Sequence, residues 1–144
     1  MESFVPISGR KAGLMKRFQE EPCAKLNRIT LDSLGLQCAE ASMPVHQEVC
    51  TAGGIVQGGV LAVLADYAGV YVAMMNDEGF TPLSSLHLEY FRPTVLARDK
   101  KAIARAIVIH KAETRIVVEV KVENENRQLK AGGTLIFARR LKNP

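Results

Sequence analysis

One carboxylate interrupts a long apolar segment, and this feature constrains the fold more than any other. The segment runs for about 16 residues, from Val60 to Met75, and reads VLAVLADYAGVYVAMM. Its only charged residue is Asp66. The pattern predicts a buried helix over residues 57–75. An ionised carboxylate is rarely buried without a partner, so Asp66 must be paired or have a shifted pKa.

A glycine-rich turn, AGGIVQGG at residues 52–59, leads into this predicted helix. Gly58 would lie at the helix N-terminus, where free backbone N–H groups and the helix dipole favour negative charge. It lies eight residues before Asp66. An N–H donor and a carboxylate are together the parts that an acyl-transfer site requires.

Small residues form a narrow stripe along the same helix. They recur at spacings of three and four and are Gly58, Ala62, Ala65, Gly69 and Ala73. Residues at this spacing share one helix face, so the stripe predicts close packing of the helix on a sheet. Asp66 flanks the stripe and should lie at the edge of that contact.

Strand patterns surround the helix. Alternating or β-branched segments occupy residues 83–91, 101–110, 114–123 and 129–140, and residues 34–50 read as one or two strands broken near Met43 and Pro44. An N-terminal helix over residues 10–21 should end at Pro22, and Gly79 is a candidate cap for the long helix. This order predicts an α+β fold in which an antiparallel sheet wraps around one central helix.

Length and composition fit one globular domain. The chain has 144 residues, of which 47% are hydrophobic and 24% charged. We expect a single domain over residues 1–144, with residues 1–33 as an N-terminal helix and lead-in. The longest apolar run is shorter than a membrane span, and the N-terminus has no continuous apolar core typical of a secretory signal, so we expect no membrane association.

Charge and cysteine content indicate which classes of partner and which location to expect. The net charge is +4 without a dense basic block, and no nucleic-acid motif is present, so we expect no nucleic-acid partner. The three cysteines, Cys23, Cys38 and Cys50, have no metal-binding spacing and cannot all pair. They favour a reducing, cytoplasmic location and predict no metal.

The segment GGIVQGGVLAVLADYAGVYVA resembles the signature of hotdog-fold acyl-CoA thioesterases of the phenylacetate-pathway (PaaI-like) type. That signature has the form G-x-x-H-G-G-x-x-x-x-L-x-D/E-x-A, and its matching positions here are Gly54, Gly58, Gly59, Leu64, Asp66 and Ala68. The later segments HLEYFRP (87–93) and AGGTLIFARR (131–140) are similar to two strands of the same family. The resemblance covers about residues 34–140.

This resemblance implies the hotdog fold and hydrolysis of an acyl-CoA without a cofactor. Gly58 matches the glycine whose N–H polarises the thioester carbonyl, and Asp66 matches the carboxylate that activates water or attacks the acyl carbon. In this family the two come from different subunits, which implies a homodimer or homotetramer with the active site at the subunit interface. Gly58 and Asp66 would be about 12 Å apart along one helix, which independently favours a shared site.

Two positions depart from the family pattern. The signature histidine is replaced by Gln57, and the common upstream asparagine by Thr51. Glutamine can still donate a hydrogen bond and threonine can orient water, so Gln57 is kept as a catalytic candidate. The substrate-binding candidates are Gly59, Thr51, Tyr67, Ser84 and Arg92, and basic residues near Arg92, Arg98, Lys100 and Lys101 could meet nucleotide phosphates.

Three alternatives compete with the thioesterase. A non-catalytic acyl-CoA-binding protein would explain the loss of the histidine to Gln57, although it has no need for Asp66. A structural oligomer with a degenerate site is the second alternative. An enoyl-thioester hydratase shares the fold but usually needs a histidine beside the acid, and this helix has none. The sequence identifies neither the acyl group nor the choice between dimer and tetramer.

Overall fold

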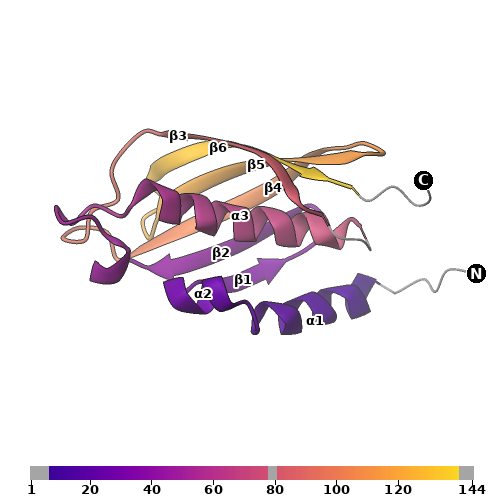
Figure 1. The fold of residues 1–144 in the computed structure, drawn as a ribbon, viewed down its shortest axis with the longest axis horizontal. Coiled ribbons are helices and arrows are strands. Elements are labelled where there is room, and N and C mark those ends of the chain that lie inside the picture. The colour runs from indigo at the N-terminus through magenta and orange to yellow at the C-terminus, as the bar shows by residue number, and fades with distance from the viewer. Residues whose placement is uncertain (1–6, 78–80, 140–144) are drawn as a thin grey trace, which may run out of the picture.

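A six-stranded antiparallel sheet curves around one long helix, as the sequence predicts (Figure 1). The computed structural model describes residues 7–77 and 81–139. The strand order is β1-β2-β4-β5-β6-β3, and every neighbouring pair is antiparallel. The strands are β1 (Thr30–Leu34), β2 (Cys38–Pro44), β3 (Leu83–Tyr90), β4 (Lys101–Lys111), β5 (Arg115–Asn124) and β6 (Leu129–Ala138). The helices are α1 (Ile7–Phe18), α2 (Pro22–Asn27), α3 (Gly58–Met75) and the 3-10 turn η1 (Gln47–Val49).

The N-terminal region differs from the prediction at Pro22. The predicted helix over 10–21 is α1, which ends at Phe18, and Pro22 begins the short helix α2 instead of ending a segment. Proline suits the first helical position because its missing N–H would have no partner there. The first strand begins at Thr30, before the predicted range 34–50, and β2 ends at Pro44 as expected. Gly79, the predicted cap, lies outside the described residues.

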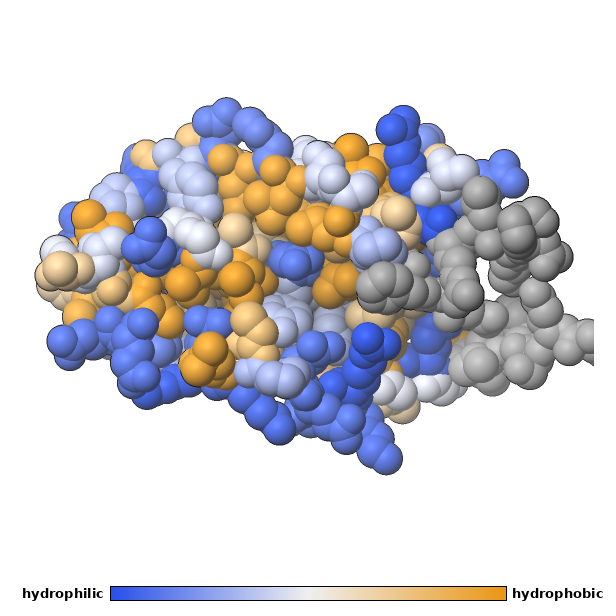
Figure 2. Space-filling view, in the orientation of Figure 1, coloured by the Kyte–Doolittle hydropathy of each residue, from blue (hydrophilic) through white to orange (hydrophobic). Residues whose placement is uncertain are grey.

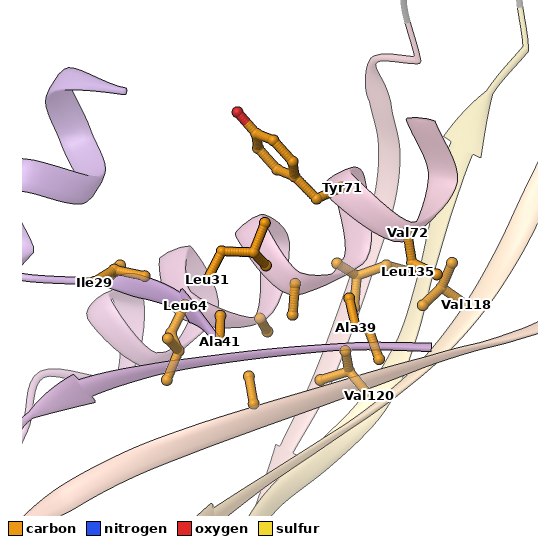
Figure 3. Packing of buried hydrophobic residues seen from close by; sticks show 14 of the residues in the cluster. Ile29, Leu31, Ala39, Ala41, Leu64, Tyr71, Val72, Val118, Val120 and Leu135 are labelled. Carbon is orange, nitrogen blue, oxygen red and sulfur yellow. The ribbon is translucent and has the colours of Figure 1, made fainter. Parts of the chain in front are cut away.

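Helix α3 supplies the centre of the core. Ten of its residues are buried, and it packs mainly on β4 and β2. Figure 3 shows Val72 turned toward Val118 and Leu135 of the sheet, whereas Tyr71 points away from the strands. The Tyr71 hydroxyl donates to Glu21 Oε1 at 2.8 Å, and its ring contacts Phe18 edge-on, so α1 and the segment after it cover that side of α3.

By length and composition alone, α3 would also pass as a membrane-spanning helix. Its position explains the composition, because the central helix of a wrapped sheet meets apolar side chains on most of its surface. The helix predicted over residues 57–75 is confirmed except at its first position, because α3 begins at Gly58 and Gln57 is its N-cap residue.

Two glycines permit close approaches. A Cβ at Gly69 of α3 would lie 3.1 Å from Leu135 Cδ2 and from two ring carbons of Phe137, so the helix backbone rests directly on β6. This confirms the close packing that the stripe of small residues predicts. A Cβ at Gly133 of β6 would collide with the His87 carbonyl of β3, which is backbone and cannot rotate away.

The contact at Gly133 gives a stability prediction. Gly133→Ala should separate β3 from β6 locally and lower the free energy of unfolding by at least about 2 kcal/mol. Gly13→Ala is the matched control, because nothing lies within 4 Å of a Cβ there in helix α1. It should be neutral or stabilising by up to about 1 kcal/mol. Urea unfolding of both variants measures the difference, and equal midpoints would contradict the collision.

Candidate active site

Two backbone donors are free at the N-terminus of α3. The N–H groups of Gly58 and Gly59 donate to no described residue, and the side chain of the N-cap residue Gln57 makes no capping bond. The next donor, the Val60 N–H, bonds the Gln57 carbonyl at 2.9 Å. The first turn of a helix carries the positive end of its dipole, so the two glycines present an electropositive, uncapped surface.

Space above these donors is open on one side and bounded on the other. A Cβ at Gly59 would meet nothing within 4 Å. A Cβ at Gly58 would lie 3.5 Å from the ring of Tyr90, the last residue of β3. The Tyr90 hydroxyl donates to the Gly58 carbonyl at 2.6 Å, so the end of β3 is tied to the start of α3.

The turn that precedes α3 is held by two other segments. The Gln57 N–H donates to the Val49 carbonyl, and the Val56 N–H to the Thr94 carbonyl, both at 2.9 Å. The Leu96 N–H donates back to the Gly54 carbonyl at 2.9 Å. The 94–96 segment therefore positions the glycine-rich turn.

A buried ion pair anchors that segment to the sheet. Lys130 Nζ lies 3.1 Å from Asp99 Oδ2, and both side chains are 3% exposed. Lys130 also donates to the Pro93 carbonyl, while Asp99 accepts from the Val95 N–H at 2.7 Å and from Asn124 Nδ2 at 2.9 Å. Burial alone would raise the pKa of Asp99, but these hydrogen bonds and the Lys130 charge outweigh it and hold that pKa below its usual value.

Asp66 is half-buried and carries no partner in the described chain. It makes no hydrogen bond or ion pair with residues 7–77 or 81–139, and burial raises its pKa above the ordinary value. Gly69, three residues on, is buried against β6, so Asp66 lies at the border of the helix–sheet contact. The carboxylate is thus destabilised when charged and available to react.

An apolar strip of surface runs beside Asp66 and is formed by side chains of α3 and β3. Leu86, Leu88 and Tyr90 of β3 pair with Leu135, Gly133 and Ala131 of β6, and cross-strand partners point to the same face. Because Leu135 contacts α3 at Gly69, these three β3 side chains also face the helix side.

The helix side of this apolar strip is formed by Val63 and Val70, which flank Asp66 at helical spacing and are partly exposed. Figure 2 shows apolar side chains gathered over α3 and the neighbouring strands on this face. Leu86 is 37% and Tyr90 48% exposed, so the described chain leaves the apolar strip uncovered.

The remaining predicted site residues are dispersed. Thr51 closes the 51–55 turn, accepting from the Ile55 N–H at 3.4 Å and donating its own N–H to the Ile55 carbonyl at 2.7 Å. Tyr67 packs edge-on against Phe18 of α1, and burial, first among several causes, raises its pKa to about 12. The Ser84 hydroxyl donates to the Ile136 carbonyl at 3.1 Å.

Arg92 follows Tyr90 by two residues and is exposed. Its side chain makes no hydrogen bond or ion pair within the described segments, which leaves the guanidinium free for a ligand. The substrate-binding roles of Thr51, Tyr67, Ser84 and Arg92 stay predictions.

A second cationic region lies at the opposite edge of the sheet from β3. A pocket of about 410 Å³ there is lined by Arg28, Thr30, Ser42, Met43, Pro44, Lys100, Lys101 and Glu125. Lys100 and Lys101 both line this pocket. The pocket lies on the β1 side of the sheet, whereas the apolar strip beside Asp66 includes β3, the opposite edge strand, so the two lysines do not lie beside Asp66.

Tyr90 is the site residue that sequence reasoning missed. It lies within the HLEYFRP segment, whose similarity to the family concerns the end of the strand. Its position in the alternation of β3 could have placed it on the helix side. Nothing in the sequence indicates its bond to Gly58, because that contact joins residues 32 positions apart.

Comparison with known proteins identifies the family of this chain. The family model of the thioesterase superfamily matches residues 53–131, which include the glycine-rich turn, α3 and β3. A comparison with functionally curated proteins gives no match.

Several solved structures share this fold. The PaaI protein of the E. coli phenylacetic acid degradation operon aligns with a TM-score of 0.75 and 22% identity, over 93% of this chain and 98% of its own. Thioesterase HI1161 from Haemophilus influenzae aligns with a TM-score of 0.75 and 20% identity, over 94% and 91%. Conserved protein PA5202 from Pseudomonas aeruginosa aligns with a TM-score of 0.75 and 26% identity, over 83% and 94%.

The family model spans more than half of the chain, and the solved structures reproduce its sheet and central helix. The resemblance seen in the sequence is thereby confirmed at the level of family and fold. This chain belongs to the thioesterase superfamily and is a thioester hydrolase.

Proposed function

We propose that this protein hydrolyses an acyl- or aroyl-CoA thioester to the free acid and CoA. Asp66 serves as base or nucleophile, and the Gly58 N–H polarises the carbonyl. The observation that carries the proposal is that α3 holds both kinds of group. Two uncapped N–H groups lie at its start, and Asp66 supplies an unpartnered, half-buried carboxylate further along. Backbone donors stabilise the negative charge that develops on the carbonyl oxygen, and the carboxylate supplies the base.

The reaction balances without a cofactor. In the base route, Asp66 takes a proton from water, the water oxygen attacks the acyl carbon, and the carbonyl oxygen becomes an anion bound to the free N–H groups. The C–S bond then breaks, and the departing thiolate takes the proton. In the nucleophilic route, an Asp66 oxygen attacks the acyl carbon, the C–S bond breaks and CoA leaves as the thiolate. Water then hydrolyses the mixed anhydride, which restores Asp66, releases the acid and supplies the proton that the thiolate takes. Single turnover in H₂¹⁸O tests the nucleophilic route, because ¹⁸O enters the Asp66 carboxylate only when water attacks Asp66 Cγ of an anhydride.

Geometry favours a site shared by two copies of the chain. Gly58 and Asp66 are eight residues apart on one straight helix, or about 12 Å, which is too far for both to touch one carbonyl. Strand β3 is the open edge of the sheet, and nearly all of its residues are exposed. An uncovered edge strand with apolar side chains readily pairs with another chain. A homodimer, or a homotetramer built from it, would bring Asp66 of one copy to Gly58 of another.

The apolar strip and Arg92 suit the two ends of the substrate. Val63, Val70, Leu86 and Leu88 provide apolar surface for an acyl or aryl group. Arg92, just beyond Tyr90, is a free cation near this strip and could bind a phosphate of CoA. Arg98, Lys100 and Lys101 are the other predicted phosphate contacts, but Lys100 and Lys101 line the pocket at the other side of the sheet and could not serve the Asp66 of their own copy.

The location that we propose is the cytoplasm. All three cysteines are free, which fits a reducing compartment.

A non-catalytic acyl-CoA-binding protein is the alternative function. Its support is that Gln57 stands where the family signature has a histidine. The Gln57 side chain makes no hydrogen bond that caps α3, so the structure gives it no capping role in place of that histidine. A binding protein has no use for a charged carboxylate within an apolar strip. The same variant, Asp66→Asn, therefore distinguishes the two functions.

Asp66→Asn should lower kcat by about 10²–10⁴-fold while leaving the affinity for acyl-CoA nearly unchanged. Free-thiol release from phenylacetyl-, benzoyl-, hexanoyl- and palmitoyl-CoA measures turnover and ranks the acyl groups. Asp32→Asn, at an exposed position of β1, is the control and should keep full activity. Absence of turnover in the natural protein, with acyl-CoA still raising its Tm, would favour the binding protein.

The raised pKa of Asp66 predicts opposite effects on stability and activity. The folded-state pKa of Asp66 exceeds its unfolded value. The free energy that Asp66 contributes to folding is therefore fully present at pH values below the unfolded pKa, and it is lost as the pH rises through the folded pKa. Asp66→Asn should therefore raise Tm at pH 7 and change it little at pH 3. Catalysis needs the ionised form, so kcat/KM should fall as the pH drops through the same pKa. A lower Tm for the variant at pH 7 would contradict this account.

The shared site can be tested by mixing two inactive variants. Gly58→Pro removes the first N–H of α3, and proline is favoured at this position. Gln57 has φ −56° and ψ 130°, which suits a residue before proline. The variant should fold and lose about 10²–10³-fold in kcat. Refolded 1:1 with Asp66→Asn, it should regain about a quarter of natural activity through mixed dimers with one intact site. No recovery in mixed dimers would place both groups within one copy.

A further inference from the structure

We propose that Tyr90 is a positioning residue that makes the Gly59 N–H a second donor for the substrate carbonyl. The inference deepens the proposed function and rests on it. Its basis is the hydrogen bond from the Tyr90 hydroxyl to the Gly58 carbonyl at 2.6 Å. Nothing in the family resemblance or in the comparisons assigns a role to this tyrosine.

The bond acts on the peptide that joins the two glycines. The Gly58 carbonyl and the Gly59 N–H belong to the same peptide unit, and a donor on the oxygen polarises the whole amide. The Gly59 proton becomes more positive as a result. The Gly58 N–H belongs to the preceding peptide and does not receive this effect directly. The tyrosine therefore acts selectively on the second of the two free donors.

Gly59 is placed to use that polarisation. Its N–H donates to no described residue, and nothing lies within 4 Å of a Cβ built on it. A ligand oxygen can thus approach both glycine N–H groups from the open side. On the other side, the Tyr90 ring lies 3.5 Å from the Cβ position of Gly58 and forms a wall.

The tyrosine is itself held in place. Its strand pairs with β6 through Tyr90 opposite Ala131, and the next residues continue the contact, since the N–H groups of Phe91 and Arg92 both donate to the Lys130 carbonyl. Lys130 carries the buried ion pair with Asp99. Burial raises the pKa of Tyr90, so its hydroxyl stays protonated and remains a donor at neutral pH.

Tyr90→Phe tests the inference, because it removes the hydroxyl and keeps the ring. The expected result is a loss of about tenfold in kcat with KM nearly unchanged, since a carbonyl donor acts mainly in the transition state. Tyr71→Phe is the matched control. It also removes one hydroxyl hydrogen bond, to Glu21 on the far side of α3, and should lower stability but not kcat.

A second measurement does not depend on turnover. In ¹H–¹⁵N spectra of the free protein, Tyr90→Phe should move the Gly59 amide proton upfield by more than that of Gly58, whereas Tyr71→Phe should move neither. Equal kcat for Tyr90→Phe and the natural protein, or an unchanged Gly59 shift, would overturn the inference and leave the thioesterase intact. A natural protein without any hydrolysis would instead remove the proposed function, while the amide shift would still report the polarised peptide.

Discussion

The contact between α3 and β6 determines where everything reactive lies. Because Gly69 has no side chain, the helix backbone approaches Leu135 and Phe137 directly, which leaves little freedom for the helix to rotate. The rotation of α3 about its axis places Asp66 beside that contact, at the border of the apolar strip. A larger side chain at residue 69 would push the helix outward. The carboxylate would then lose the partial burial that raises its pKa.

The helix also carries both halves of the proposed chemistry at a fixed separation. The donors are at its first turn and the carboxylate is two turns further, so neither can move relative to the other without breaking the helix. In a two-fold assembly, one offset between two copies of α3 would set the distance from donor to carboxylate in both sites. The open edge of β3 is the element that would define this offset.

The apolar run and its single acid were enough to predict the central helix and the position of Asp66 on it. The strand patterns after residue 80 likewise predicted β4, β5 and β6 closely, because their alternation reflects one buried face. Pro22 was misjudged because a proline can either stop a helix or begin one, and only the packing of α2 decides.

Contacts between distant residues could not be predicted in the same way. Tyr90 on Gly58 and Lys130 on Asp99 depend on how the strands are ordered in the sheet, and β3 pairs with the last strand rather than with a neighbour in sequence. In the sequence, Lys130 and Asp99 resemble the solvated charges around them. Only burial shows that they form one network.

The ion pair between Lys130 and Asp99 has a consequence for how this site can evolve. Backbone hydrogen bonds from the 94–96 segment position the glycine-rich turn, and the ion pair anchors that segment to the sheet. The Gln57 side chain makes no capping hydrogen bond, so a substitution at residue 57 can change the chemistry beside the donors without displacing them. The backbone geometry of the site can therefore stay the same while the side chains beside the donors change, so substrate preference can diverge during evolution without a change of fold.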